Sequence, residues 1–147
     1  MTKEEQLNKA IQIADIAHAG QTDRYGAPYI GHVLRVSNLG KTLDEKIVGA
    51  LHDVVEDCPE YDFDYLRSQG FPEYIVFAVK CVTKLSDDEN YDDFVKRTEK
   101  SPLSVAVKLN DLTDNMDLRR FTRPISEKDA KRLNKYLKAY RYLSGKY

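Results

Sequence analysis

The sequence predicts an all-α fold, an orthogonal bundle of several helices, and two observations support this. Apolar residues recur at helical spacing in nearly every segment, and no stretch alternates as a strand would. Glycines, prolines and short polar stretches separate these segments. A chain of 147 residues is long enough to bury a core, so we expect one domain over residues 1–147.

Glycine and proline divide the N-terminal part into three predicted helices. The first ends at Gly20 and has one apolar face, formed by Leu7, Ala10, Ile11, Ala14, Ala17 and His18. Residues 21–31 hold two glycines and a proline and are predicted to form a loop. A short helix then carries His32 and ends before Gly40. The third helix is predicted from Asp44 to Asp57, with Pro59 marking its end.

The remaining sequence carries start signals for further helices. Side chains that accept hydrogen bonds from the first turn, and prolines within that turn, are typical of helix starts. The polar stretch at residues 86–90 is a break between two of these helices. We expect the helices to begin near Asp62, Pro72, Tyr91, Ser101-Pro102 and Ser126.

Composition restricts the partners. The formal net charge is −1, so no overall field draws the chain toward nucleic acid or anionic membrane. The apolar runs are too short to cross a bilayer, and the N-terminus lacks the apolar core of a signal peptide. The two cysteines form no CxxC pair. We therefore expect a cytoplasmic protein that binds neither nucleic acid nor membrane, and we leave self-association open.

The pair His52-Asp53 carries the most functional information. It interrupts an apolar helical pattern, and the acidic pair Glu56-Asp57 follows one turn later. Such groups are costly to bury without a partner that offsets their desolvation. A divalent cation is such a partner, and mixed nitrogen and oxygen ligands favour Mn, Fe, Zn or Co over Ca. The alternative is a hydrogen-bonded core histidine beside a solvated helix end.

Two more positions favour the metal interpretation. His32 follows the glycine-proline loop, and Asp111 interrupts another apolar helix, with Asn115 one turn later. The order His32, His52-Asp53, Asp111 matches the H…HD…D pattern of the HD-domain metal phosphohydrolases, and the chain resembles their RelA/SpoT-type branch. The segments that carry this resemblance are residues 18–21 (HAGQ), 26–32 (GAPYIGH), 51–57 (LHDVVED), 82–85 (VTKL), 107–111 (VKLND) and 115–116 (NM).

The resemblance, which covers about residues 5 to 143, implies a stand-alone hydrolase domain of the HD type. It implies that His32, His52, Asp53 and Asp111 hold one divalent ion, typically Mn²⁺. Glu56 and Asp57 match the acidic pair that handles the attacking water, and Asn115 matches a residue near the nucleotide. With three histidines in the chain, a two-iron site would need extra carboxylates.

The implied substrate is guanosine 3′,5′-bis(diphosphate), cleaved to GDP and pyrophosphate. Another phosphorylated nucleotide, such as NADPH losing its 2′-phosphate, is the alternative within the same reaction type. A sensor domain that binds metal and nucleotide without turnover is the non-enzymatic alternative. The acidic pair argues against this sensor, because a pure binder has no use for two acids beside an anionic ligand.

Two departures from the family pattern concern substrate recognition. Leu112 follows Asp111 where the family has arginine, and Asp23-Arg24 replaces two basic residues ahead of the loop. Arg24 is then a candidate for holding a phosphate or stacking on a base, with a surface role as the alternative. Tyr25, together with Tyr29, is a candidate for a nucleobase pocket, with loop packing as the alternative.

The remaining candidates are basic or histidine side chains. Lys108 either reaches a phosphate or extends its head into solvent. Lys84 fits a family motif, but a lysine at a helix C-terminus is equally well explained by the helix dipole. His18 is expected to be a core histidine that could orient a neighbouring ligand. The basic side of the last helix is expected to be a solvated face rather than a surface for RNA or membrane.

Overall fold

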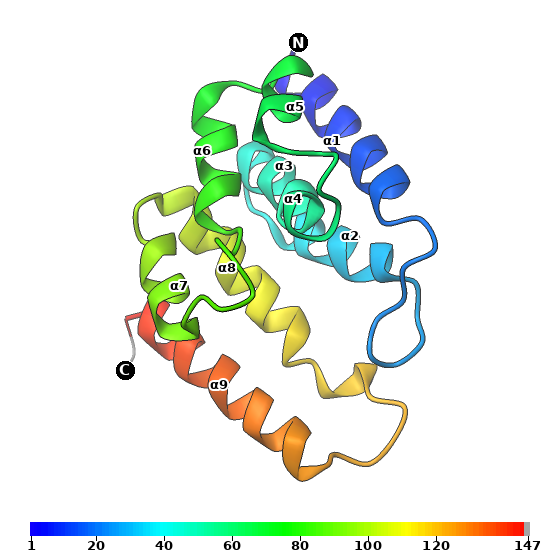
Figure 1. The fold of residues 1–147 in the computed structure, drawn as a ribbon, viewed down its shortest axis with the longest axis vertical. Coiled ribbons are helices and arrows are strands. Elements are labelled where there is room, and N and C mark those ends of the chain that lie inside the picture. Colours follow the sequence, from blue (N-terminus) through cyan, green and yellow to red (C-terminus); the bar gives the residue numbers. More distant parts are fainter. Residues whose placement is uncertain (146–147) are drawn as a thin grey trace.

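The computed structural model describes residues 1–145 and confirms the all-α prediction. In chain order the elements are α1 (Lys3–Ala17), α2 (Tyr29–Leu39), α3 (Leu43–Leu51), α4 (Val54–Asp57), α5 (Phe63–Ser68), α6 (Glu73–Cys81), α7 (Tyr91–Thr98), α8 (Pro102–Asn115), the 3-10 turn η1 (Leu118–Arg120) and α9 (Glu127–Leu143). In this range the extended pairing is limited to one isolated bridge, between Thr22 and Pro28. Figure 1 shows α3 near the centre of the bundle.

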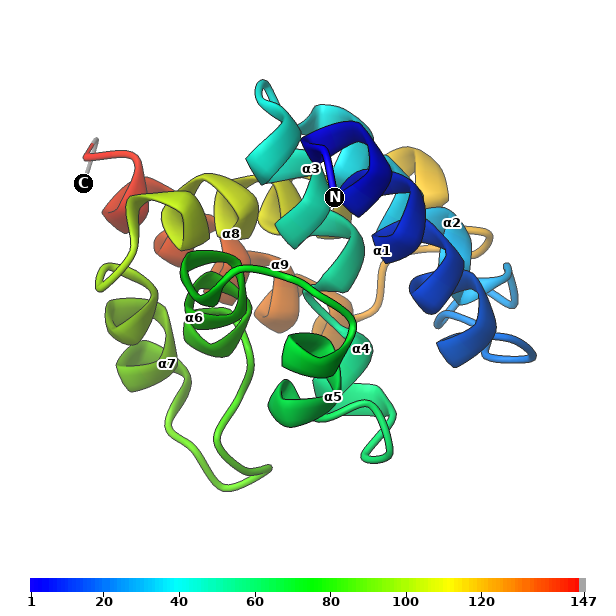
Figure 2. The same ribbon diagram turned by 90° about the horizontal axis from the view of Figure 1, so that it is seen from above.

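The central position of α3 follows from its sequence. Its last five residues, 47–51, are all buried, and a helix that is apolar on every side belongs in the interior. It packs against α1, α2, α6 and α8, and Figure 2 shows α1 directly beside it. Because α3 is enclosed in this way, the residues at its C-terminal end, His52 and Asp53, are carried into the interior.

The helix starts expected from capping signals are present. Asp62 accepts a hydrogen bond from the backbone of Tyr65, and Ser101 accepts one from Ser104. Ser126 and Asp129 form a reciprocal capping box at the start of α9. These caps satisfy backbone N–H groups that a helix cannot pair within itself.

The structure corrects two predicted boundaries. Residues 44–57 do not form one helix, because α3 ends at Leu51 and α4 begins at Val54. The imidazole Nδ1 of His52 lies 2.6 Å from the carbonyl oxygen of Gly49, which a continuous helix would pair with the next turn. In addition, α2 begins at Tyr29, inside the predicted loop, because Pro28 occupies its N-cap.

A second apolar cluster joins the C-terminal helices. Val95 from α7, Leu112 from α8 and Ala139 from α9 are buried together, with tyrosines packed around them. This cluster holds α9 along α8, on the side of α8 away from α1 (Figure 1). The segment before α9 lies beside the loop that follows α1, where the ring centres of Phe121 and Tyr25 are 4.7 Å apart.

Two smaller features bear on the expected surroundings of the protein. Cys58 and Cys81 are buried free thiols. Among residues 1–145, no helix combines the length and the apolar character that crossing a bilayer requires.

Gly49 makes the close approach of α2 and α3 possible, and this can be tested. A Cβ atom at this position would lie 3.0 Å from Cα of Ser37 and 3.2 Å from its backbone nitrogen. We expect Gly49→Ala to lower the free energy of unfolding by about 1–3 kcal/mol through overpacking. The measurement is urea unfolding of the metal-free protein.

The control is Gly31→Ala, a helical glycine whose added Cβ meets the flexible tip of Arg35. We expect this variant to be no less stable than the starting protein, because alanine is the better helix former. Equal stabilities for the two variants would contradict the packing argument.

Candidate metal centre

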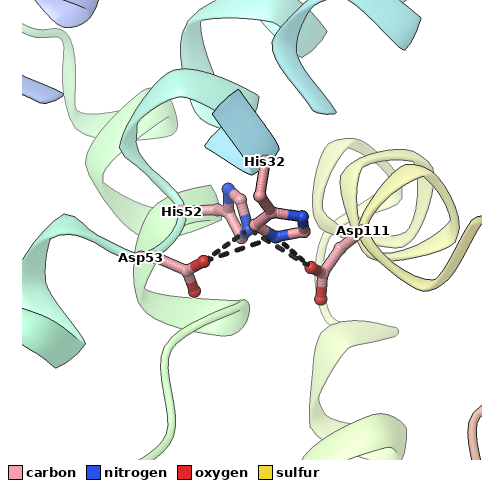
Figure 3. A group of neighbouring side chains, drawn as sticks. All are labelled: His32, His52, Asp53 and Asp111. Carbon is pink, nitrogen blue, oxygen red and sulfur yellow. Dashed lines mark ion pairs between the residues drawn. The ribbon is translucent and has the colours of Figure 1, made fainter. Parts of the chain in front are cut away.

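Four side chains from three parts of the fold converge in the interior. His32 lies in the first turns of α2, His52 and Asp53 form the turn between α3 and α4, and Asp111 lies on α8. One ligand atom from each residue lies within 4.8 Å of the others. Figure 3 shows both imidazole rings between the two carboxylates. This donor set suits a divalent transition metal.

The individual distances define the arrangement. Nε2 of His32 lies 3.0 Å from Oδ1 of Asp111 and 3.7 Å from Oδ2 of Asp53. Nε2 of His52 lies 3.0 Å from Oδ2 of Asp53 and 3.4 Å from Oδ1 of Asp111. The histidine side chains are 2–3% exposed, and the carboxylates 15% and 11%. The break between α3 and α4 lets His52 and Asp53 point to one place although they are neighbours in sequence.

The Nδ1 atoms of both histidines face acceptor oxygens, which leaves Nε2 of each neutral ring as the nitrogen that can bind a cation. Nδ1 of His52 faces the Gly49 carbonyl, and Nδ1 of His32 lies 2.6 Å from a carboxylate oxygen of Asp114. Carbonyl and carboxylate oxygens accept, so both Nδ1 atoms carry hydrogen and Nε2 keeps its lone pair in the neutral ring. Within residues 1–145, Nε2 of His52 is buried without a hydrogen-bond partner. The four residues therefore fit a bound metal ion.

The charges at the centre also favour a cation. Burial alone would lower the pKa of His52, but the carboxylates of Asp53 and Asp111 raise it well above its ordinary value. Burial would raise the pKa of Asp111, whereas Lys108 and the histidines hold it well below its ordinary value. Two ionised carboxylates thus face two imidazoles, and this arrangement attracts positive charge.

The acidic pair after Asp53 divides between two surroundings. Glu56 lines the cavity beside the metal centre, and its Oε1 accepts a hydrogen bond of 3.1 Å from the backbone of Lys84. Oδ2 of Asp57 lies 3.9 Å from Nδ1 of His18, outside the cavity lining. Burial, Asp53 and Glu56 raise the pKa of Asp57 to about 7. The two acids of this pair therefore lie in different surroundings, one in the cavity and one beside His18.

His18 and Tyr29 support the centre from behind. His18 is buried, with Nδ1 2.9 Å from the amide oxygen of Gln21, and its ring stacks on Tyr29. The Tyr29 hydroxyl donates a hydrogen bond to Asp53. This bond fixes the Asp53 carboxylate, so Tyr29 has a role that the nucleobase hypothesis did not foresee.

A cavity of about 370 Å³ opens onto the centre. All four side chains predicted to contact substrate line it: Arg24, Tyr25, Lys108 and Asn115. Lys108 is buried rather than solvated, with Nζ 3.1 Å from Oδ2 of Asp111. The amide of Asn115 donates to the other oxygen of Asp111, at 3.1 Å.

Further lining residues were not singled out as site residues from the sequence. Arg132, Lys135 and Tyr136 on α9 line the cavity, which corrects the expectation that the basic side of this helix is only a solvated face. Their spacing places them on one stripe of the helix, a signal that the sequence contained. Lys84 lines the cavity too. Tyr91 and Phe94 from α7 and Arg120 from η1 are also among the lining residues.

The two departures from the family pattern have structural explanations. Leu112 is fully buried in the second apolar cluster and does not line the cavity, so it packs α8 against α9 instead of contacting substrate. Asp23 lines the cavity, but its Oδ1 accepts hydrogen bonds from the backbones of Tyr25 and Ala27, at 2.9 and 3.0 Å. Asp23 thus shapes the loop that presents Arg24 and Tyr25.

The fold and the site define a helical protein with a candidate centre for one divalent metal ion. No family model matches the chain. It is 33% identical over 147 residues to the GTP pyrophosphokinase of Streptomyces coelicolor, covering 92% of this chain and 17% of that relative. It is 28% identical over 123 residues to the guanosine-3′,5′-bis(diphosphate) 3′-pyrophosphohydrolase of Aquifex aeolicus, covering 76% and 17%.

A third relative is the bifunctional (p)ppGpp synthase/hydrolase SpoT of Escherichia coli, 29% identical over 124 residues, covering 75% of this chain and 17% of that relative. The chain spans about a sixth of the length of these curated relatives. Their names include both synthesis and hydrolysis of (p)ppGpp. The similarity supports a relationship to the RelA/SpoT-type enzymes of alarmone metabolism and leaves the direction of the reaction to the site chemistry.

Asp114 allows a test of the metal centre. It orients His32 through Nδ1, and such partners typically contribute about 10–100-fold to metal affinity. We expect Asp114→Asn to weaken Mn²⁺ binding by about tenfold or more, measured by titration calorimetry of the metal-free protein. The control is Asp117→Asn, at a partly exposed position after α8 that pairs with Arg119. Equal Mn²⁺ affinity in both variants would contradict the role of Asp114.

The raised pKa of Asp57 leads to a pH-dependent prediction for the metal-free protein. A carboxyl whose pKa is raised to about 7 stabilises the fold only while protonated, so this contribution is lost as the pH rises from about 4 through 7. We expect Asp57→Asn to raise Tm, relative to the starting protein, more above pH 7 than near pH 4. Asp15→Asn, on the exposed side of α1, is the control and should show no such trend. A pH-independent difference for Asp57→Asn would contradict the assignment.

Proposed function

We propose that the chain is an HD-type, Mn²⁺-dependent phosphohydrolase that removes pyrophosphate from the 3′ position of guanosine 3′,5′-bis(diphosphate). The observation that carries this proposal is the meeting of two kinds of group in one cavity. Three of the four candidate ligand residues, His32, Asp53 and Asp111, line this cavity, and basic side chains from helices and loops line it as well. A phosphorylated nucleotide can bind between a cation and these basic groups. The names of the relatives support the guanosine substrate.

The donor set supports one ion. His32, His52, Asp53 and Asp111 offer two nitrogen and two oxygen ligands within a single small volume. Mn²⁺ accepts this mixture, and the proposal names it because of the family resemblance. When bound, the ion would lower the pKa of a water molecule and offset negative charge on the phosphoryl oxygens.

The chain's own acids would handle the protons of hydrolysis. The reaction forms a bond from a water oxygen to the phosphorus on the 3′ oxygen and breaks the bond between that phosphorus and the 3′ oxygen. Glu56 reaches the cavity and burial raises its pKa, so it is placed to accept a proton from the water. Glu56 can then return this proton to the leaving 3′ oxygen, because it lines the cavity. Asp57, with its pKa of about 7, can hold a second proton near neutral pH beside His18, outside the cavity lining.

Basic side chains would bind the phosphates. Within residues 1–145, Arg24, Lys84 and Lys135 line the cavity and form no ion pair; the ammonium of Lys135 lies over the rings of Tyr91 and Tyr136. Their charges are therefore available to an anionic ligand. Lys108, by contrast, already pairs with Asp111 and stabilises the ionised form of the Asp111 carboxylate. The combination of free cations with a proton acceptor favours hydrolysis of a phosphorylated substrate.

A cytoplasmic location belongs to the same proposal. It is supported by the two free thiols, Cys58 and Cys81, because reduced cysteines are typical of reducing compartments.

The decisive variant is Glu56→Gln. We expect kcat for release of pyrophosphate to fall by about 10²–10⁴-fold, because a proton acceptor is lost. Mn²⁺ affinity should change little, since Glu56 is not among the convergent ligands. Glu60→Gln, an exposed neighbour outside the cavity, is the matched control and should keep normal turnover. Normal turnover by Glu56→Gln would remove this residue from the mechanism.

The substrate is tested by a screen. Guanosine 3′,5′-bis(diphosphate), NADPH and simple nucleotides are incubated with the protein and Mn²⁺, and released phosphate and pyrophosphate are quantified. The proposal predicts the fastest turnover, with pyrophosphate and GDP as products, for the guanosine compound. Faster release of phosphate from NADPH would show that NADPH is the better substrate. Binding of a nucleotide without release of phosphate or pyrophosphate would identify a sensor domain.

A further inference from the structure

Arg120 occupies an unusual position among the basic residues of the cavity. It lies in η1, directly before the loop that leads to α9. Its side chain is 13% exposed, and its two terminal nitrogens are both engaged by protein groups. Both Nη atoms of Arg120 are therefore occupied by protein groups, whereas its Nε is buried without a hydrogen-bond partner among residues 1–145. Arg24 and Lys84, by contrast, form no ion pair within these residues. The contacts of Arg120 indicate a structural link instead of a contact to phosphate.

One end of this link is the carboxylate that orients a metal ligand. Nη1 of Arg120 lies 3.0 Å from Oδ2 of Asp114, and the same oxygen lies 2.6 Å from Nδ1 of His32. Nη1 also donates to the backbone carbonyl of Asp114, at 3.0 Å. The Asp114 carboxylate is 5% exposed and is held from the other side by Arg35, whose Nε donates to Oδ1 at 2.7 Å.

The other end of the link is the loop between α1 and α2. Nη2 of Arg120 lies 3.2 Å from Oδ2 of Asp23, whose carboxylate is 8% exposed. The second oxygen of Asp23 accepts the backbone N–H groups of Tyr25 and Ala27. The guanidinium of Arg120 also lies 5.6 Å from the centre of the Tyr25 ring. In Figure 1 the loop after α1 comes down beside η1, as these contacts require.

We propose that Arg120 is a positioning residue that clamps the loop of residues 22–28 to Asp114, so that the carboxylate that orients His32 also anchors the nucleotide-facing loop. The chain of contacts runs His32–Asp114–Arg120–Asp23, and Arg24 and Tyr25 follow directly on the clamped segment. Arginine suits this role, because its planar fork can bind two carboxylates at once, whereas a lysine offers a single point charge.

The clamp has a functional consequence that rests on the proposed function. Most of this loop is exposed, and Gly26 adopts φ +82°, a backbone conformation that glycine enters freely. Besides its own backbone hydrogen bonds, the loop is held to the rest of the fold by Arg120 and by the packing of Tyr25 on Phe121. Holding the loop before the nucleotide arrives reduces the entropy lost on binding. Removing the clamp should therefore weaken substrate binding and leave the chemical step largely intact.

The test compares Arg120→Gln with Arg119→Gln. Arg119 is the adjacent arginine, its side chain is 90% exposed, and it pairs only with Asp117 among residues 1–145. The first readout is amide hydrogen exchange of residues 22–28 in the metal-free, nucleotide-free protein. We expect exchange at Tyr25 and Ala27 to become about tenfold faster in Arg120→Gln, since a buried charged hydrogen bond is lost, and to stay unchanged in Arg119→Gln.

The second readout separates binding from chemistry. We expect Arg120→Gln to raise KM for the nucleotide about tenfold, with kcat and Mn²⁺ affinity within about threefold of the starting protein, because Arg35 still holds Asp114. The KM of Arg120→Lys should fall between those of the starting protein and of Arg120→Gln. Unchanged exchange and KM in Arg120→Gln would overturn the proposal, and so would an equal loss of kcat and Mn²⁺ affinity.

A second variant keeps the test decisive if Arg120→Gln does not fold. Asp23→Asn retains an oxygen for the N–H groups of Tyr25 and Ala27 but removes the ion pair with Arg120. It should accelerate exchange in the loop in the same way, and unchanged exchange in this variant would also overturn the clamp. If the starting protein hydrolyses none of the nucleotides tested, the proposed function fails, while the exchange data still decide whether the clamp exists.

Discussion

The structure depends on placing two carboxylates and two imidazoles together in the interior. Such groups are costly to desolvate, and their geometry is held by bonds from every side. Gly49 brings α2 against α3 and its carbonyl orients His52, while Tyr29 fixes Asp53 and Lys108 fixes Asp111. The buried helix α3 ends directly before His52 and Asp53 and so places this pair in the interior. The two nitrogen and two oxygen donors that result would suit a divalent cation.

The sequence predicted most of the fold, because helix period, caps and breaks are local signals. It did not predict the turn at His52-Asp53. The apolar pattern continues through this turn, and the helix ends because the His52 imidazole takes the Gly49 carbonyl that the next turn would have used. The convergence of His32 with Asp111 was inferred from family resemblance. Spacing alone could not supply it, because these residues lie on separate helices whose packing is set by the whole core.

The residues that sequence reasoning missed share one property. Asp114, Arg120 and Arg132 are charged side chains in helical or loop segments, where a solvated position is the usual outcome. Only the fold shows that Asp114 lies behind His32 and that Arg120 spans from it to Asp23. The Asp23 departure from the family pattern thereby becomes part of a charge network. The Leu112 departure has a separate explanation, because this residue packs α8 against α9.

Whether His32, His52, Asp53 and Asp111 form a site for one divalent ion can be measured by metal analysis. The purified full chain and the variant His52→Ala are each loaded with Mn²⁺, free ion is removed, and the retained metal is quantified. We expect one tightly held ion per chain and none in His52→Ala, since that variant removes one of the two candidate nitrogen ligands. Two ions per chain, or undiminished retention by His52→Ala, would contradict this single-ion site.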